Sequence, residues 1–393
     1  MKLGEVCEIK GRIGFRGYTK KDLVKEPDGA ITLSPSNIIN GRISYENCSY
    51  ISWAKYYESP EIIAEIGDVV FTKTASVGKT AYIEDKPKEM TINPQLVLLK
   101  KFKGNSKYLS YILKASFFQN EVMRITGVGS VPNVSQSSIA QILIPLPPLE
   151  IQNRIVEVLD KMTTLEAELE AELEARKRQY EYYRSKLLTV SEVGGGIRFV
   201  RLGDLFELRN GYTPSKGNVD FWTDGTIPWF RMEDIRANGK ILNDSIQHIT
   251  PSAIKGKGLF PAGSFILATT ATIGEHALLT TDSLANQRFT NLSVRKTHQK
   301  DVNIKFLYHY MFIIDEWCKK NVNSSSFASV DMSKLKEYTI PIPPLSEQQR
   351  IVSILDRFEA LTTDLQSGLP AEIEARRQQY EYYRNKLLTF EAV

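Results

Sequence analysis

Two stretches of the chain place apolar or aromatic residues at alternating steps of three and four, which is the spacing of one face of a long helix. The first stripe starts at Ile151, and a matching stripe starts at Phe358. The first contains Ile155, Val158, Met162, Leu165, Leu169, Leu173, Tyr180, Tyr183 and Leu187. Its two successive four-residue steps from Leu165 form a stutter that locally unwinds a left-handed coiled coil. A helix of about 40 residues spans roughly 60 Å, so each predicted helix needs the other as an antiparallel partner.

These helices belong to a longer repeat. ILIPLPPLEIQNRIVEVLD (142–160) returns as YTIPIPPLSEQQRIVSILD (338–356), and RQYEYYRSKLL (178–188) returns as QQYEYYRNKLL (378–388). The offset grows from 196 to 200 residues, so the second helix contains one additional four-residue step. Gly368 and Pro370 lie within this second stripe, and we expect them to interrupt or kink the helix.

The segments before the helices alternate short apolar runs with turn residues, which is typical of short strands. We predict an α+β fold in which two pseudo-twofold-related mixed α/β domains are separated by two long antiparallel coiled-coil helices. The expected boundaries are 1–148 for the first domain, 149–193 for the first helix, 194–200 for a Gly-rich linker, 201–344 for the second domain and 345–393 for the second helix.

The chemistry-bearing motifs are weak. ASVGKT (75–80) resembles the end of a phosphate-binding loop, but Lys73 stands where the loop needs glycine. A hairpin in each half is favoured, with Gly78 and Gly274 in turn conformations. The residues expected at the two tips are Lys73, Ser76 and Lys79, and Thr269, Thr272 and His276. The histidines and cysteines show no metal-ligand spacing, and no catalytic motif is present, so we expect no catalytic site, metal or cofactor in this chain.

Charge and hydropathy limit the class of protein further. The formal net charge is +4, and each globular segment carries four more basic than acidic residues, whereas the helical remainder carries four fewer. This excess permits nucleic-acid binding without requiring it. No apolar run approaches the roughly 20 residues of a membrane helix, and the N-terminus lacks the apolar core of a secretory signal. We therefore expect a cytoplasmic protein that does not bind membranes.

The duplicated PLPPLEIQNRIV and PIPPLSEQQRIV tracts, the QYEYYR-x-KLL helix ends and the order globular, helix, globular, helix resemble the specificity subunit of type I DNA restriction-modification systems. The resemblance covers the whole chain. It implies that each domain is a target-recognition domain for one half of a split double-stranded DNA sequence, and that the helices separate the half-sites. It further implies binding of two methyltransferase subunits, which would hold S-adenosylmethionine, and of restriction and translocase subunits in the full complex.

Base reading needs donors and acceptors on loops, and phosphate binding needs basic and small hydroxyl residues. On these grounds the DNA-binding candidates in the first domain are Arg12, Arg16, Lys20, Lys21, Ser36, Asn37, Lys73, Ser76 and Lys79. Those in the second domain are Arg209, Tyr212, Lys216, Arg231, Glu233, Thr270, Thr272 and Arg288. For any single candidate, a surface residue without DNA contact is an equal alternative.

The tyrosine clusters at the two helix ends are candidate partner-binding residues: Tyr180, Tyr182, Tyr183, Tyr380, Tyr382 and Tyr383. Tyr180 and Tyr183 fit the stripe between the helices, whereas Tyr182 and Tyr382 point elsewhere. Because the patch occurs twice, it could bind two copies of one methyltransferase subunit, with core packing as the alternative. Two other functions stay open at this point, namely a coiled-coil scaffold with two protein-binding domains and a self-sufficient methyltransferase.

Overall fold

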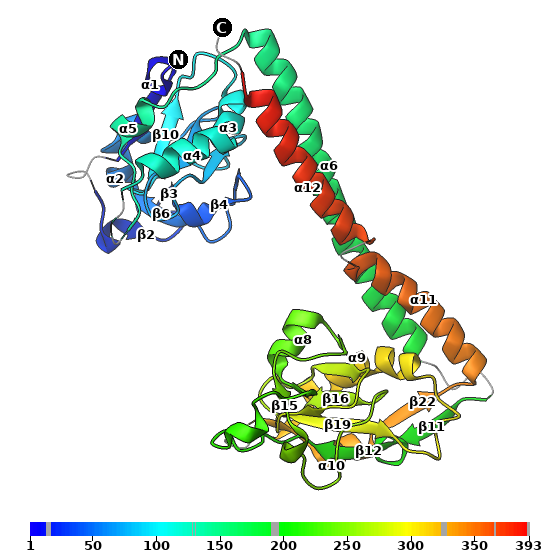
Figure 1. The fold of residues 1–393 in the computed structure, drawn as a ribbon. Helices are drawn as coiled ribbons and strands as arrows, with labels where there is room; N and C mark the ends of the chain where they lie inside the picture. The colour runs from blue at the N-terminus through cyan, green and yellow to red at the C-terminus, as the bar shows by residue number, and fades with distance from the viewer. Residues whose placement is uncertain are drawn as a thin grey trace. The chain divides into compact units, whose positions relative to one another are not determined.

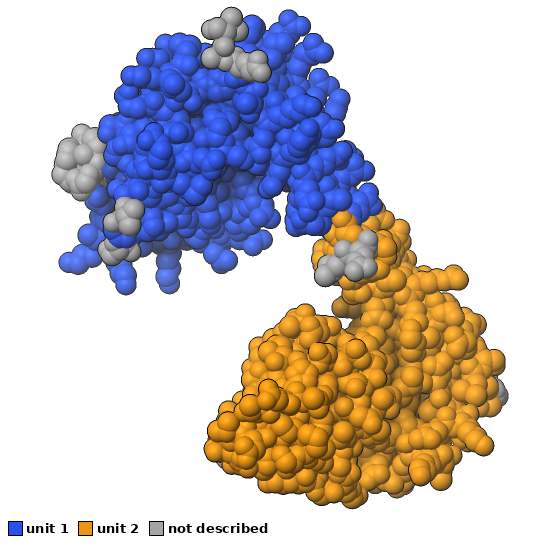
Figure 2. Space-filling model, in the orientation of Figure 1, with its two compact units in different colours: residues 1–170, 372–393 blue, residues 171–371 orange. Residues whose placement is uncertain are grey.

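The computed structural model describes residues 1–12, 17–127, 129, 131–189, 196–323, 328–364 and 367–390. The chain forms two compact units (Figure 2). Unit 1 consists of residues 1–170 and 372–393, and unit 2 consists of residues 171–371. Each unit therefore contains one globular domain together with parts of the long helices. No described helix is both long enough and apolar enough to cross a lipid bilayer.

The domain of unit 1 is built on two four-stranded sheets, with strand orders β1-β10-β7-β8 and β2-β6-β3-β9. The strands are β1 (Glu8–Gly11), β2 (Leu23–Val24), β3 (Gly29–Leu33), β4 (Ile38–Ile39), β5 (Arg42–Ile43), β6 (Ser49–Ser52), β7 (Val69–Thr72), β8 (Thr80–Tyr82), β9 (Met90–Ile92) and β10 (Leu96–Lys100). The helices are α1 (Leu3–Val6), α2 (Trp53–Tyr57), α3 (Ser106–Lys114), α4 (Ser116–Ile125) and α5 (Gln136–Ala140).

The alternation of side chains along β10 explains how the first sheet is covered on both faces. Val97 and Leu99 belong to the core beneath α3 and α4, whereas Leu96 and Leu98 belong to the core shared with the second sheet. Because successive strand residues point to opposite faces, a fully apolar strand such as this one must be buried on both sides. The helices α3 and α4 lie over one face of this sheet (Figure 1).

The domain of unit 2 repeats this topology around a five-stranded sheet of order β12-β19-β16-β17-β14 and a three-stranded sheet of order β15-β13-β18. Its strands are β11 (Arg198–Arg201), β12 (Phe206–Asn210), β13 (Ile227–Phe230), β14 (Ile241–Leu242), β15 (His248–Ile249), β16 (Phe265–Ala268), β17 (His276–Leu279), β18 (Leu284–Ala285), β19 (Phe289–Val294), β20 (Val322–Asn323), β21 (Ser329–Val330) and β22 (Thr339–Ile342). Its helices are α7 (Leu202–Leu205), α8 (Met232–Asn238), α9 (Ile304–Lys320) and α10 (Met332–Glu337).

The long helices differ in continuity. α6 (Leu149–Leu188) is a single helix of 40 residues. The second stripe forms two helices, α11 (Leu345–Thr363) and α12 (Leu369–Leu388), of 19 and 20 residues. The interruption expected from Gly368 and Pro370 is therefore confirmed. Pro370 occupies the first turn of α12, where a missing N–H costs no helical hydrogen bond.

The helices pair in antiparallel fashion inside each unit, as predicted. In unit 1, Arg377 of α12 contacts Glu166 and Glu170 of α6, and its Nε lies 2.7 Å from the Glu166 carboxylate. In unit 2, Phe358 of α11 stacks on Tyr180 and Tyr183 of α6, with ring centroids 6.3 and 5.6 Å apart. Figure 1 shows α6 running beside α12 in the first case and beside α11 in the second.

Each domain core takes in the ends of two different long helices. In unit 1 the core contains Ile155 and Leu159 from the start of α6 and Leu388 from the end of α12. In unit 2 the core contains Leu355 from α11 and Leu188 from the end of α6. These residues at the helix ends are thus part of the domain cores. They are buried by the domain as well as by the neighbouring long helix.

Candidate nucleic-acid interface

The β7–β8 hairpin of unit 1 presents polar residues at its tip. Ala75 and Gly78 both have positive φ, at 66° and 95°, and the Gly78 N–H donates to the Thr72 carbonyl at 3.0 Å. A Cβ on Gly78 would lie 2.4 Å from the Gln119 side chain, so glycine suits this turn both for its φ and for its lack of a side chain. The turn leaves Ser76 and Lys79 exposed.

Two other loops join this tip. The Lys73 N–H donates to the Gln95 carbonyl at 2.9 Å, and the Val134 N–H donates to the Lys73 carbonyl at 2.9 Å. The Thr74 hydroxyl also donates to Asn133 Oδ1 at 2.7 Å. We call residues 73–79, 93–95 and 132–134 the unit 1 edge.

The same three segments meet in unit 2. The Thr269 N–H donates to the Arg288 carbonyl at 3.0 Å, and the Val330 N–H donates to the Thr269 carbonyl at 2.9 Å. Ala271 and Gly274 repeat the positive φ values, at 66° and 76°. We call residues 269–275, 286–288 and 328–330 the unit 2 edge. Both hairpins expected from the sequence are therefore confirmed.

Comparison of the two edges identifies residues that the sequence reasoning missed. In each unit an asparagine side chain closes a turn: Asn93 Oδ1 accepts the Gln95 N–H at 2.9 Å, and Asn286 Oδ1 accepts the Arg288 N–H at 3.0 Å. Gln95 is therefore the counterpart of the candidate Arg288. The shared signal is an asparagine two residues before the polar side chain, in NPQ and NQR.

The remaining exposed candidates lie on elements other than the two hairpins. Lys20 and Lys21 lie on the short helix η2 (Lys20–Asp22), and Ser36 lies on η3 (Pro35–Asn37). In unit 2, Lys216 precedes η5 (Val219–Phe221), and Glu233 is in the first turn of α8. Arg16 lies outside the described residues.

Four candidates have side chains committed to their own domain. Arg12 is only 5% exposed; its Nε donates to the Ile92 carbonyl at 3.4 Å, and burial lowers its pKa. Asn37 is 4% exposed and bonds to Ser34 and Ser44. The guanidinium of Arg209 donates to the carbonyls of Lys257 and Leu259. The Tyr212 hydroxyl donates to the Ala253 carbonyl and accepts a hydrogen bond from the Lys255 N–H. These four side chains brace loops, and their burial and bonding disfavour direct base contact.

Two candidates keep unused bonding capacity. Arg231 Nε is buried and lacks a hydrogen-bond partner, with the Glu233 carboxylate 4.0 Å away. Thr272 Oγ1 is likewise buried without a partner. Buried polar atoms without partners are unusual. The Arg231 Nε–H can therefore donate to a ligand, and the Thr272 hydroxyl can donate to or accept from one. Trp229 and Phe230, by contrast, are core residues: they are 3% and 0% exposed, and Trp229 Nε1 donates to the Tyr212 carbonyl at 3.0 Å.

The expected exposure of Thr269 and His276 at the hairpin tip is wrong. Thr269 is 7% exposed, and its hydroxyl lies 3.0 Å from Thr290 Oγ1. His276 is fully buried as the first residue of β17, and its Nδ1 lies 2.7 Å from Asp315 Oδ2. Lys240 Nζ lies 3.2 Å from the same oxygen. Burial lowers the pKa of His276. The sequence could not reveal this because the partners come from α9 and from the turn before β14.

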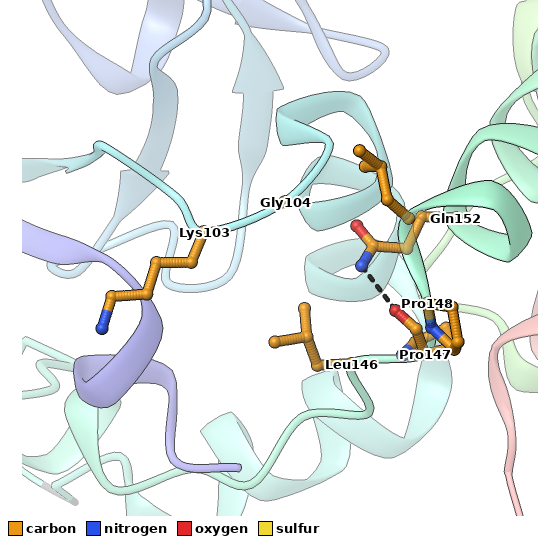
Figure 3. A pocket seen from close by; sticks show the side chains of 7 residues that line it. Lys103, Gly104, Leu146, Pro147, Pro148 and Gln152 are labelled. Carbon is orange, nitrogen blue, oxygen red and sulfur yellow. Dashed lines mark hydrogen bonds between the residues drawn. The ribbon is translucent and has the colours of Figure 1, made fainter.

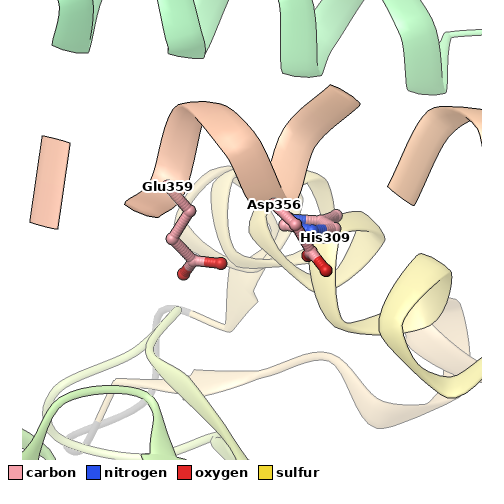
Figure 4. Close-up of side chains that lie close together, drawn as sticks. All are labelled: His309, Asp356 and Glu359. Carbon is pink, nitrogen blue, oxygen red and sulfur yellow. Dashed lines mark hydrogen bonds and ion pairs between the residues drawn. The ribbon is translucent and has the colours of Figure 1, made fainter. Parts of the chain in front are cut away.

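A second histidine cluster in unit 2 contains His309, Asp356 and Glu359 (Figure 4). Their ligand-type atoms lie within 4.8 Å of one another, as a metal centre would require. However, His309 Nε2 and Lys305 Nζ both bond to Asp356, at 2.9 and 2.6 Å, and Tyr308 donates to Glu359 at 2.6 Å. Because these atoms already have protein partners, the cluster is a hydrogen-bond network that joins α9 to α11.

A groove at the start of α6 is likewise explained by hydrogen bonds within the domain. Lys103, Gly104, Leu146, Pro147, Pro148, Leu149 and Gln152 line it (Figure 3). Gln152 Nε2 donates to the Pro147 carbonyl at 2.7 Å, and Gln152 Oε1 accepts the Asn105 N–H at 2.9 Å. The proline tract therefore enters the helix in a fixed, extended path.

The tyrosines at the helix ends divide as expected between buried and exposed positions. Tyr180 is 7% exposed, and its hydroxyl lies 3.3 Å from His309 Nδ1; Tyr380 packs partly buried against the unit 1 core. Tyr182 and Tyr382 are each 59% exposed. Tyr183 and Tyr383 are also exposed, at 36% and 40%. The two clusters therefore present the same exposed aromatic pair twice.

The chain thus consists of two similarly folded domains, whose edges differ in side chains, and a repeated helix. Comparison with known proteins identifies the family. The model of the type I restriction modification DNA specificity domain matches residues 1–175 and 195–375, and the chain belongs to this family.

Individual relatives agree with this assignment. The chain is 50% identical over 204 residues to the EcoprrI specificity subunit of Escherichia coli, covering 50% of this chain and 51% of that protein. It is 39% identical over 273 residues to the EcoR124I/EcoR124II specificity subunit, covering 65% of each. The matches thus span between half and two thirds of these relatives. A putative type I specificity subunit of Mycoplasma pneumoniae is 24% identical over 98% of this chain and 96% of its own length.

Solved structures show the same fold. A chain from a structural study of type I restriction-modification complex assembly covers all of this chain and 97% of its own length, with a TM-score of 0.69 and 19% identity. The HsdS subunit of Thermoanaerobacter tengcongensis covers 99% of this chain and 95% of its own, with a TM-score of 0.54 and 20% identity. The predicted fold class is therefore confirmed.

Proposed function

We propose that the chain is the non-catalytic specificity subunit of a type I restriction-modification complex and recognises a bipartite, asymmetric double-stranded DNA sequence. The carrying observation is that two domains of one topology present edges built from equivalent segments but different side chains. Unit 1 offers Lys73, Gln95 and Asn133, whereas unit 2 offers Thr270 and Arg288. Like frameworks with unlike edges would read unlike half-sites.

The chemistry of the edges supports base and phosphate contacts. Arginine pairs with guanine and glutamine or asparagine pairs with adenine in the major groove, so Arg288, Gln95 and Asn133 are our first choices for base reading. Exposed Lys79, Lys20, Lys21 and Lys216 suit backbone phosphates, which position a protein without specifying sequence. Arg12, Asn37, Arg209 and Tyr212 would act by holding the loops that carry these groups.

The helices would set the number of unread base pairs between the half-sites. One four-residue step lengthens a helix by about 6 Å, close to two base-pair rises of about 3.4 Å. The second stripe contains one more such step than the first, yet α11 and α12 together have one residue fewer than α6. The additional residues fall at the interruption between α11 and α12. The continuous helix α6 is therefore the better candidate for the element that fixes the spacing.

The exposed tyrosines support a partner role. Tyr182 and Tyr382 occupy equivalent places in the two units and are equally exposed. We propose that each binds one methyltransferase subunit, which would use S-adenosylmethionine on an adenine flipped out of the duplex. Restriction and translocase subunits would join the same complex.

Selection from a random duplex pool tests this function. Purified chain with methyltransferase subunits should enrich two short motifs at one fixed spacing, with binding that weakens as salt rises. Absence of DNA affinity, with and without these subunits, would instead favour a coiled-coil scaffold with two protein-binding domains. Methyl transfer by the purified chain alone would contradict the non-catalytic role.

A further inference from the structure

Three basic residues converge in unit 1 at a place that the candidate interface does not include. Arg42 follows the β4–β5 turn, Lys114 is the last residue of α3, and Arg384 lies near the end of α12. Lys114 Nζ donates to the carbonyl of Gly41 at 3.2 Å, directly beside Arg42. The charges of Arg384 and Arg42 both act on Lys114.

These cations lack local neutralisation. Among the ion pairs of the described residues, none includes Arg42, Lys114 or Arg384. The nearest carboxylates that influence Lys114 are Glu84 and Asp160, and both pair with Lys107, at 3.1 and 3.2 Å. Asp160 also accepts the Tyr111 hydroxyl at 2.5 Å. The negative charge in this neighbourhood is already shared with other donors.

Two further observations indicate an unmet need for an acceptor. Arg384 Nε is buried and has no hydrogen-bond partner, although its guanidinium carbon lies 5.3 Å from the Tyr380 ring centroid. Burial, together with repulsion from Arg384 and Arg42, lowers the pKa of Lys114 to about 8. An anion at this place would relieve the repulsion and satisfy the orphaned N–H.

Unit 2 contains the same framework in a neutralised form. Asn238, Gly239 and Lys240 repeat the turn Asn40, Gly41 and Arg42, and Arg184 repeats Arg384. The position of Lys114, nine residues after the N-cap Asn105, is taken by Phe312, nine after the N-cap Asn303. Arg184 and Lys240 lie 4.0 and 4.5 Å from the Phe312 ring centroid, and Lys240 pairs with Asp315 at 3.2 Å. Unit 2 thus replaces the third cation with an aromatic ring and adds a carboxylate.

We propose that Arg42, Lys114 and Arg384 form a phosphate-binding site in unit 1. A phosphate group offers several acceptor oxygens, which suits two guanidinium groups and an ammonium group that approach from three different elements. The phosphate belongs either to the DNA backbone, in which case the site deepens the proposed DNA recognition, or to a free phosphate or nucleotide. The site itself does not depend on DNA recognition by the edges.

Binding of inorganic phosphate and pyrophosphate to the full-length chain tests the site directly. Titration calorimetry without DNA, at constant ionic strength, should give an affinity that falls at least about tenfold in R384Q and in R42Q, because each loses a charged hydrogen bond. The exposed Arg42 can be changed without disturbing the core. R184Q, the matched change in unit 2, should keep the wild-type affinity. Equal phosphate binding by wild type, R42Q and R384Q, or no binding by wild type, would overturn the proposal.

The source of the phosphate follows from a second arm. If it belongs to DNA, R42Q should reduce the slope of log affinity against log salt by about one for duplex binding. An unchanged slope together with weakened phosphate binding assigns the site to a free phosphate or nucleotide. Failure of DNA binding by the wild-type chain leaves the calorimetric result unaffected, so the two proposals fail separately.

Discussion

Gln152 and Asn105 join the first turn of α6 to the start of α3, through a 2.9 Å bond from the Asn105 N–H to Gln152 Oε1. The relationship is repeated in unit 2, where Gln348 Oε1 accepts the Asn303 N–H at 2.7 Å. Both glutamines are buried, and both also donate to the proline tract that precedes their helix. They fix the direction in which each long helix leaves its domain.

Replacement of Gln348 by leucine should therefore destabilise unit 2. It leaves the Asn303 N–H and the Pro343 carbonyl without their side-chain partner in a buried place, at a cost of about 1–3 kcal/mol. Urea unfolding followed by tryptophan fluorescence measures this, since three of the four tryptophans lie in unit 2. The control is Q349A, whose exposed side chain accepts a hydrogen bond from Asn303 Nδ2 at 3.0 Å. A loss as large in Q349A as in Q348L would contradict this role.

Unit 2 should lose stability as pH falls from about 7 to 5.5. Burial lowers the pKa of both His276 and His309 in the folded chain. In the unfolded chain the histidine pKa is about 6.5, so below that pH the unfolded chain binds more protons than the folded chain. The stability is complete above that value and is lost as pH decreases through this window, at up to about 1.4 kcal/mol per pH unit for each histidine. The same fluorescence assay at several pH values measures the slope.

H276N should flatten this slope by up to half. H298N is its control, because His298 is only partly buried and lies in the loop between β19 and α9. Unit 1 provides an internal reference, since all four histidines lie in residues 171–371. An unchanged slope in both H276N and H309N would refute the role of the buried imidazoles.

The exposed tyrosines predict the stoichiometry of assembly. Y182A and Y382A should each weaken the binding of one methyltransferase subunit, and the double variant should weaken both. Aromatic residues at interfaces commonly contribute about 1–4 kcal/mol, which corresponds to a loss of affinity between roughly fivefold and several hundredfold. Mass photometry of reconstituted complexes counts the bound subunits. Y57A, which removes an equally prominent tyrosine from α2, should have no effect.

The interruption of the second long helix predicts an asymmetry between the two stripes. Deletion of residues 365–368 should leave the spacing of the half-sites unchanged, because α11 ends at Thr363 and α12 begins at Leu369. Sequencing of methylated sites in cells that contain the variant and its partner subunits measures this spacing. A spacing change equal to that of a four-residue deletion in α6 would mean that the second helix contributes to the length as well.

The fold could be predicted from the sequence because the sequence contains it twice. Two copies of the proline tract, the helix end and the Gly-centred hairpin allowed each half to support the interpretation of the other. The interruption after Thr363 was also predictable, since Gly368 and Pro370 oppose a continuous helix.

The candidate site was less predictable because tertiary contacts decide which of its residues are exposed and which are bound to their own domain. Arg12 and Arg209 stand in basic or turn-rich tracts and were therefore candidate phosphate ligands, but their guanidinium groups donate to backbone carbonyls that are distant in the sequence. Gln152 looks like a solvent-facing helix residue, yet it is 2% exposed. Gln95 could have been found by aligning NPQ with NQR. That alignment matches two turns that each begin with asparagine, although the side chains that follow differ in type.

The central claim is that the two domains each recognise one half-site and that the length of α6 sets the separation between the half-sites. Deletion of one tetrad from α6, residues 169–172, with sequencing of methylated sites in cells that supply the partner subunits, tests it most directly. We expect both half-site sequences to remain as in the wild type, while the number of unread base pairs between them decreases by no more than about two. Altered half-site bases at an unchanged spacing would contradict the account.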